Sequence, residues 1–127
     1  MYVCIDFDGT IVDHAFPEIG DPVPGAIEEI KRIQEAGAKI ILFTMRSDGP
    51  QYGDVLTQAV NYLDRNGIGL YGINKNPDQD KWTSSLKAYG HLYIDDSALG
   101  CPLIYPPNFR RPCVDWVAVK EHLEVLF

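Results

Sequence analysis

The chain alternates short apolar runs with segments whose apolar residues recur every three or four positions. The runs are rich in β-branched residues and stop at turn-forming or acidic residues, which is typical of strands buried within a sheet. They predict four strands and a short fifth one, at residues 2–7, 39–44, 68–73, 91–94 and 101–105.

Between these runs, apolar residues recur at helical spacing. Pro24 precedes the first such segment and Gly37 follows it, as expected for the start and the stop of a helix. The spacing predicts helices at residues 26–36, 55–63 and 116–126.

Strands and helices that alternate in this way predict an α/β fold. Strand–helix–strand units are connected by right-handed crossovers, which give a mainly parallel sheet covered on both faces. We therefore expect one Rossmann-like, three-layer domain over residues 1–127, with ligands bound beyond the carboxyl ends of the strands.

Composition and charge narrow the function classes. Hydrophobic residues make up 46% and charged residues 23% of the chain, as in ordinary globular domains rather than disordered ones. The net charge of −7 argues against a general binder of nucleic acid or of anionic membranes, because both would be repelled. An anionic substrate would need a binding site whose local charge differs from this overall negative charge.

The cysteines, the lengths of the apolar runs and the first residues of the chain indicate in which cellular compartment the protein lies. Cys4, Cys101 and Cys113 form an odd number at unrelated spacings, with neither a CxxC pair nor a zinc pattern, so we expect reduced thiols. No apolar run reaches the ~20 residues that span a bilayer. The first strand begins almost at Met1, so we expect no signal peptide and a cytoplasmic protein.

Acidic residues gather at the predicted strand ends. Asp6 and Asp8 end the first strand, Asp95 and Asp96 end the fourth, and Thr44 ends the second. Carboxylates that converge at one edge of a sheet repel one another unless a cation neutralises them. Oxygen ligands beside a potential phosphate site favour Mg²⁺, which takes one or two carboxylates and keeps other positions for water and phosphate.

Three segments together resemble a known family. Residues 6–10, with the sequence DFDGT, resemble the opening motif of the haloacid dehalogenase superfamily. Residues 42–44 (LFT) are similar to its second motif and residues 93–96 (YIDD) to its fourth, and the resemblance covers residues 2–99. It implies a Mg²⁺-dependent phosphomonoester hydrolase that works through an aspartyl-phosphate intermediate.

The resemblance also implies roles for individual residues. Asp6 would be the nucleophile, and Asp8 the general acid and base. Thr44 and the backbone N–H groups that begin at Met45 would bind phosphate. Mg²⁺ would be held by Asp6, by the backbone carbonyl of Asp8 and by the pair Asp95 and Asp96, with Asp96 the more direct ligand of the pair.

The superfamily also uses a lysine that contacts the nucleophile and the phosphoryl group. Lys87 is our candidate, because Ser84 and Ser85 are good N-cap residues for a short helix that would carry it at the sheet edge. Lys81 is the second candidate and Lys75 the third. Arg46 lies two residues after Thr44 and is a further candidate for phosphate contact. The role of an ordinary surface arginine fits it equally well.

The substrate is left open by these motifs. The connections at residues 11–23 and 44–55 are too short for a cap domain, so we expect a capless or minimally capped enzyme. Its site would accept a larger phosphorylated substrate or use a neighbouring subunit of a homo-oligomer as a lid. Candidate walls, each also explained by packing, are His14, Phe16, Tyr52 and Trp82.

Two other classes share some of these residues. A phosphoryl-receiving signalling domain also uses acids, a threonine and a lysine on a parallel sheet, but its acceptor follows a later strand. A magnesium-binding regulatory module without turnover would need no acid and base at Asp8. The order of the motifs favours the hydrolase.

Overall fold

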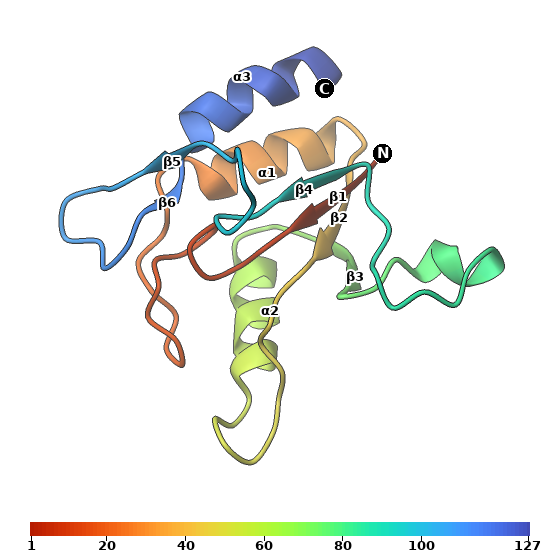
Figure 1. Cartoon of the computed structure of the whole chain (residues 1–127), viewed down its shortest axis with the longest axis horizontal. Helices are drawn as coiled ribbons and strands as arrows, with labels where there is room; N and C mark the ends of the chain where they lie inside the picture. The colour runs from red at the N-terminus through yellow and green to blue at the C-terminus, as the bar shows by residue number, and fades with distance from the viewer.

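The structure, a computed structural model, describes all 127 residues. Its centre is a parallel sheet of four strands in the order β3-β2-β1-β4 (Figure 1). The strands are β1 (Tyr2–Ile5), β2 (Lys39–Leu42), β3 (Leu70–Ile73) and β4 (Leu92–Ile94). The α/β class and the parallel sheet expected from the sequence are confirmed.

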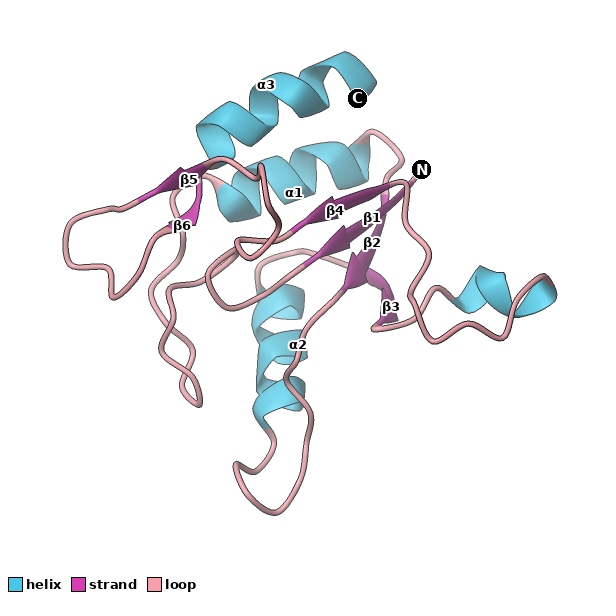
Figure 2. Cartoon of the chain, in the orientation of Figure 1, coloured by secondary structure: helices cyan, strands magenta, loops and turns pink.

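Three α-helices pack against one face of this sheet. They are α1 (Ala26–Glu35), α2 (Val55–Arg65) and α3 (Trp116–Leu126), and their buried residues join one core with Val3 and Ile5 of β1. Figure 2 shows α1 and α3 side by side above the strands. Each helix is amphipathic at helical spacing, so it buries one apolar stripe and leaves the opposite side in solvent.

The other face of the sheet is covered differently. Cys4 and Ile41 point away from the helices and pack with Ala88, which belongs to the connection between β3 and β4. This connection contains only a short 3₁₀ helix, η1 (Pro77–Lys81). The strands β1, β2 and β3 follow one another in one direction across the sheet, and the chain then returns past them to β4. Because the crossovers are right-handed, this reversal of direction puts the last connection on the opposite face.

After β4 the chain forms a second, antiparallel sheet of two short strands. These are β5 (Leu103–Ile104), inside the predicted fifth strand, and β6 (Cys113–Val114), which the sequence pattern did not predict. Asp115 caps α3 by accepting hydrogen bonds from the N–H groups of Val117 and Ala118.

The structure bears on two further expectations, one about disulfide bonds and one about membrane-spanning helices. All three cysteines are free of disulfide bonds. None of the helices has both the length and the apolar composition that a bilayer crossing requires.

Candidate metal centre

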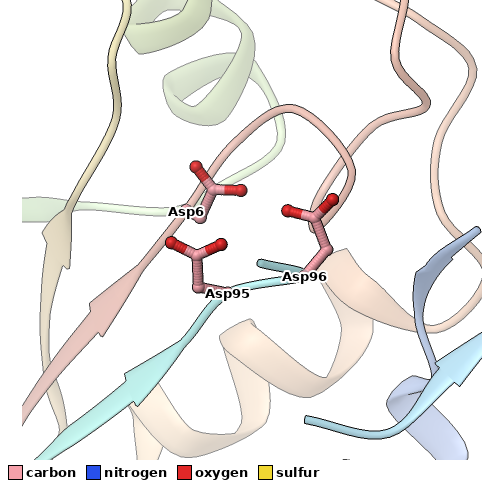
Figure 3. Close-up of side chains that lie close together, drawn as sticks. All are labelled: Asp6, Asp95 and Asp96. Carbon is pink, nitrogen blue, oxygen red and sulfur yellow. The ribbon is translucent and has the colours of Figure 1, made fainter. Parts of the chain in front are cut away.

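Three aspartates converge where the central strands end. One carboxylate oxygen from each of Asp6, Asp95 and Asp96 lies within 4.8 Å of the others. Figure 3 shows Asp6 on the loop after β1, facing Asp95 and Asp96 on the loop after β4.

The sheet order explains why these residues meet. β1 and β4 are neighbours although the whole of β2 and β3 separates them in sequence. After β1 the chain forms β2 and β3 on one side of β1 and then returns to form β4 on the other side. The crevice between the carboxyl ends of β1 and β4 is therefore the topological switch point. The Asp6 N–H donates to the carbonyl of Ile94 at 3.0 Å and holds the two loops together.

The cluster strongly perturbs the ionisation of Asp6. Burial, the negative charge of Asp95 and hydrogen bonding with Asp96 raise the pKa of the Asp6 carboxyl to about 8, from an ordinary 3.8. The hydroxyl of Thr10 opposes this by donating to Asp6 Oδ2 at 2.9 Å. Without a cation, the cluster therefore favours a proton on Asp6.

Thr10 connects the two acidic loops and was not singled out by the sequence. It is fully buried, and its hydroxyl both donates to Asp6 and accepts from the Asp96 N–H at 3.2 Å. Its carbonyl accepts from the indole N–H of Trp116 at 2.7 Å. The threonine that ends the DFDGT segment therefore links β1, β4 and α3.

His14 also approaches the cluster. Its Nε2 lies 2.8 Å from Asp96 Oδ2. Gly9, at φ +85°, makes room for this pair, because a side chain there would collide with both His14 and Asp96. The sequence suggested His14 only as a wall of the site, since no spacing rule pairs a histidine with an acid more than 80 residues away.

Asp8 is turned toward a different partner. Its two carboxylate oxygens accept from Nε and Nη2 of Arg46, each at 2.8 Å. Its backbone carbonyl accepts no hydrogen bond within the protein, so it is free for a ligand. The side chain of Asp8 thus lies outside the three-carboxylate cluster.

The surroundings of Arg46 differ from those expected from the sequence. The sequence offered it as a phosphate contact, but its side chain is buried and every N–H is used within the protein. Besides Asp8, it donates to the backbone carbonyls of Pro17, Glu18 and Val55. The guanidinium is a clamp that joins the 11–23 connection, Asp8 and the start of α2, with no donor left for phosphate.

A small cavity of about 150 Å³ opens beside Asp6. Its other lining residues are Phe43, Thr44, Met45 and Asp95. The Thr44 hydroxyl oxygen accepts from the Arg46 N–H at 3.1 Å, whereas the Met45 N–H makes no hydrogen bond within the protein. The N–H groups of Phe7 and Asp8 are likewise without a partner. Free backbone donors near a cation site suit an anionic ligand.

The three candidate lysines lie on the connection between β3 and β4. The short helix expected to begin at Ser84 and Ser85 is absent; the helical turn lies earlier, at η1. Pro77 at its start, and the side chain of Asn76, which accepts from the N–H of Asp78, explain that earlier start.

The lysine side chains have different surroundings. Lys75 pairs with Asp80 at 2.9 Å, on the surface. Lys81 and Lys87 make no ion pair, and the Nζ of Lys87 lies 5.5 Å from the centre of the Tyr93 ring. Tyr93 pairs with Cys4 across β4 and β1, and Cys4 packs on the face of the sheet that Ala88 covers. No hydrogen bond or ion pair joins Lys87 to Asp6 or Asp95, and its choice as the motif lysine stays a prediction.

The donor set fits a divalent cation. All three groups offer hard carboxylate oxygens, and the raised pKa of Asp6 reflects its burial and then the negative charge of Asp95, which a cation would neutralise. Asp6, Asp95 and Asp96 therefore form a candidate metal centre on a Rossmann-like sheet.

Comparison with known proteins gives one informative match. The chain is similar to the structure of a conserved protein coded by a locus from Bacteroides thetaiotaomicron, with 30% sequence identity and a TM-score of 0.77. The match covers 100% of this chain and 92% of that one. The two belong to the same family. That relative is described only as a conserved protein, so membership of the family alone assigns no activity.

No family model and no curated protein matches the chain.

Proposed function

We propose that this member of the family is a Mg²⁺-dependent phosphomonoester hydrolase with Asp6 as its nucleophile. The observation that carries the proposal is the meeting of Asp6, Asp95 and Asp96 at the switch point, directly beside a cavity that Met45, with its free N–H, lines. The DFDGT, LFT and YIDD segments, which resemble haloacid dehalogenase motifs, supply three walls of this site.

Asp6, Asp95 and Asp96 would hold the ion, together with the free backbone carbonyl of Asp8. Bound there, Mg²⁺ would neutralise charge that develops on the transferring phosphoryl group. Its presence would also keep Asp6 ionised, because a nearby cation lowers the pKa that the neighbouring carboxylates raise.

The ionised Asp6 would attack phosphorus in line with the ester bond. A bond forms between an Asp6 oxygen and phosphorus while the bond from phosphorus to the leaving oxygen breaks, and that oxygen takes a proton. Water then attacks the aspartyl-phosphate and releases inorganic phosphate. The N–H of Met45 and the Thr44 hydroxyl, both at the cavity beside Asp6, would stabilise the phosphoryl oxygens. The Lys87 ammonium, from outside the lining of that cavity, would be the third donor.

Asp8 would donate the proton to the leaving oxygen and later accept one from water. Both of its oxygens are bonded to Arg46 in this structure, so a proton-transfer role requires one of these bonds to open. The Arg46 clamp also contacts the 11–23 connection, which makes movement of that connection the natural way to release Asp8.

A phosphate-release screen tests the proposal. Sugar phosphates, nucleotides and phosphorylated oligonucleotides would be assayed with Mg²⁺, with Ca²⁺ and with excess chelator. We expect Mg²⁺ to support turnover, Ca²⁺ to support it poorly because its larger coordination sphere disturbs in-line attack, and Asp6→Asn to abolish it. Full turnover in chelator, or in Asp6→Asn, would exclude the mechanism.

The Arg46–Asp8 pair favours one alternative, a phosphoryl-receiving module that does not turn over. If Asp8 stays bonded to Arg46, no base activates water and the aspartyl-phosphate persists. The lifetime of phosphorylated Asp6 separates the two: loss within one catalytic cycle supports the hydrolase, and persistence for many minutes supports the module.

A further inference from the structure

Two of the three carboxylates in the metal centre have one oxygen held by a donor of their own loop. The hydroxyl of Thr10 donates to Asp6 Oδ2 at 2.9 Å, and the backbone N–H of Ser97 donates to Asp95 Oδ1 at 2.8 Å. No N–H or hydroxyl group of the protein donates to the second oxygen of either carboxylate. Each of the two groups therefore has one oxygen in use and one that a cation can take.

His14 completes this pattern at the third carboxylate. Its Nε2 lies 2.8 Å from Asp96 Oδ2, and because a carboxylate can only accept, Nε2 is the donor. The same oxygen lies against Gly9, where a side chain would collide with it. Figure 3 shows one oxygen of Asp96 directed toward Asp6 and the other directed away from it. The three carboxylates thus share one arrangement, and His14 supplies the third donor.

The position of the His14 ring is fixed by a buried neighbour. The His14 N–H donates to Asp13 Oδ1 at 2.7 Å, and Asp13 is only 5% exposed. Asp13 Oδ2 accepts from the N–H of Arg110 at 3.1 Å, on the loop between β5 and β6. Asp13 therefore ties the backbone of His14 to a second element, so that the ring meets Asp96 in a set geometry.

A carboxylate whose second oxygen is held by a donor binds a cation through one oxygen. Mg²⁺ suits such ligands, because it demands a near-octahedral set of oxygens at about 2.0–2.1 Å. Ca²⁺ takes about six to eight oxygens at about 2.3–2.6 Å, and it commonly uses both oxygens of one carboxylate. Donors that each occupy one carboxylate oxygen should therefore favour the smaller ion.

We propose that His14 is a positioning residue that keeps Asp96 a monodentate ligand and thereby favours Mg²⁺ over Ca²⁺. It acts through Asp96 and contacts neither the reacting atoms nor the substrate. Of the three donors it is the most separable, because Thr10 also links the two acidic loops and Ser97 donates from its backbone. The inference rests on the metal centre of the proposed function and does not require hydrolysis.

Isothermal titration calorimetry of the full chain, without substrate, measures Kd for each ion. His14→Ala should weaken Mg²⁺ binding by about 10–100-fold, the usual effect of removing a group that orients a metal ligand. Ca²⁺ binding should weaken much less, because the released oxygen of Asp96 becomes a second ligand for the larger ion. The ratio of Kd for Ca²⁺ to Kd for Mg²⁺ should therefore fall by about 5-fold or more.

Two further variants separate the hydrogen bond from a general effect on the fold. His14→Gln keeps an N–H donor on a side chain, so it should restore much of the Mg²⁺ affinity and of the ratio. His122→Ala removes an exposed histidine of α3 and should change neither Kd. Thermal unfolding without metal shows whether each variant folds. Should His14→Ala not fold, His14→Phe, which fills the space without a donor, carries the same expectation.

The outcomes distinguish this inference from the proposed function. An unchanged Mg²⁺ affinity in His14→Ala, or equal losses for the two ions, would overturn the role of His14 and leave the phosphatase proposal standing. A parent protein that binds neither ion would overturn both. A parent protein that binds Mg²⁺ with the expected dependence on His14, but hydrolyses no phosphomonoester, would support the inference and reject the proposed function.

Discussion

At the scale of single residues, Asp6 carries the strongest physical signature of the site. Its carboxyl is pressed between Asp95, Asp96 and a buried hydroxyl, and burial and like charge favour its neutral form. An aspartate whose folded pKa lies far above its ordinary value destabilises the folded protein once it ionises. The metal-free protein should therefore reveal Asp6 through its stability.

The first prediction uses this dependence on pH. The folded state holds a proton on Asp6 that the unfolded chain releases near 3.8, so stability falls as the pH rises from about 4 to about 8. At pH 8 in chelator, Asp6→Asn should raise Tm by about 2–6 °C, because an amide carries no charge. Thermal unfolding from pH 5 to 9 measures this, with Asp64→Asn on the surface of α2 as the control.

The parent protein and Asp6→Asn should also respond differently to Mg²⁺. The ion should raise Tm of the parent protein at pH 8 and have little effect on Asp6→Asn, which lacks one ligand. A parent protein whose stability rises between pH 5 and pH 8 without metal would contradict the environment described for Asp6.

Arg46 is the second residue whose surroundings make a sharp prediction. A lysine can donate at most three hydrogen bonds from one point, whereas Arg46 donates to both Asp8 oxygens and to three carbonyls. Arg46→Lys should therefore lower the free energy of unfolding by about 2 kcal/mol or more, since a broken buried ion pair costs about 3–5 kcal/mol. Urea unfolding provides the measurement.

Arg65→Lys, an exposed change at the end of α2, is the matched control and should be nearly neutral. Asp8→Asn should destabilise as well, because it leaves the buried guanidinium without its anion. If the free energy of unfolding of Arg46→Lys lies within about 0.5 kcal/mol of the parent value, which is the scatter expected for surface changes, the clamp does not stabilise the fold.

At the scale of elements, the turn after β1 assembles the site. Gly9 has positive φ and lies against the His14–Asp96 pair, while Thr10 bridges the loops after β1 and β4. The conformation of this turn, rather than the strand itself, sets where Asp6 and Asp96 meet.

The third prediction separates backbone strain from crowding at this turn. Gly9→Ala should weaken Mg²⁺ binding, because the new methyl group displaces His14 and Asp96. Gly37→Ala carries the same kind of strain at φ +103° but meets no atom within 4 Å. Both variants should be less stable than the parent, and only Gly9→Ala should lose the increase in Tm that Mg²⁺ gives. Equal Mg²⁺ responses would show that the turn does not position the metal ligands.

The elements also show which parts of the fold are predictable. Strands and helices with long apolar patterns, such as α1 and α3, were predicted nearly to the residue, because burial on one side dictates their spacing. The helix expected near Lys87 was wrong, since Ser84 and Ser85 suit a turn as well as a helix cap. β6 has only two residues and depends on pairing with β5, which leaves no pattern of its own.

At the scale of the whole molecule, the sheet order brings distant motifs together. Asp6 and Asp95 were predicted to converge because parallel strands end at the same edge. The partners of Asp8 and Asp96, namely Arg46 and His14, were not predicted. They meet through packing of the 11–23 and 44–55 connections, where sequence carries no periodic signal. The chemistry at strand ends was therefore accessible from sequence, and the contacts between loops were not.

The most direct test of the central claim is a search for the covalent intermediate. The protein would be mixed with Mg²⁺ and a phosphomonoester that it hydrolyses, quenched rapidly in acid, and analysed by intact-protein and peptide mass spectrometry. Asp8→Asn would be treated in parallel, because loss of a general base slows water attack, commonly by about 10²–10⁴-fold. The account predicts one added phosphoryl group on Asp6 that accumulates in Asp8→Asn and is absent from the Asp6→Asn, Asp8→Asn double variant. Hydrolysis with the phosphoryl group on another residue, or undiminished hydrolysis by Asp6→Asn, would contradict it.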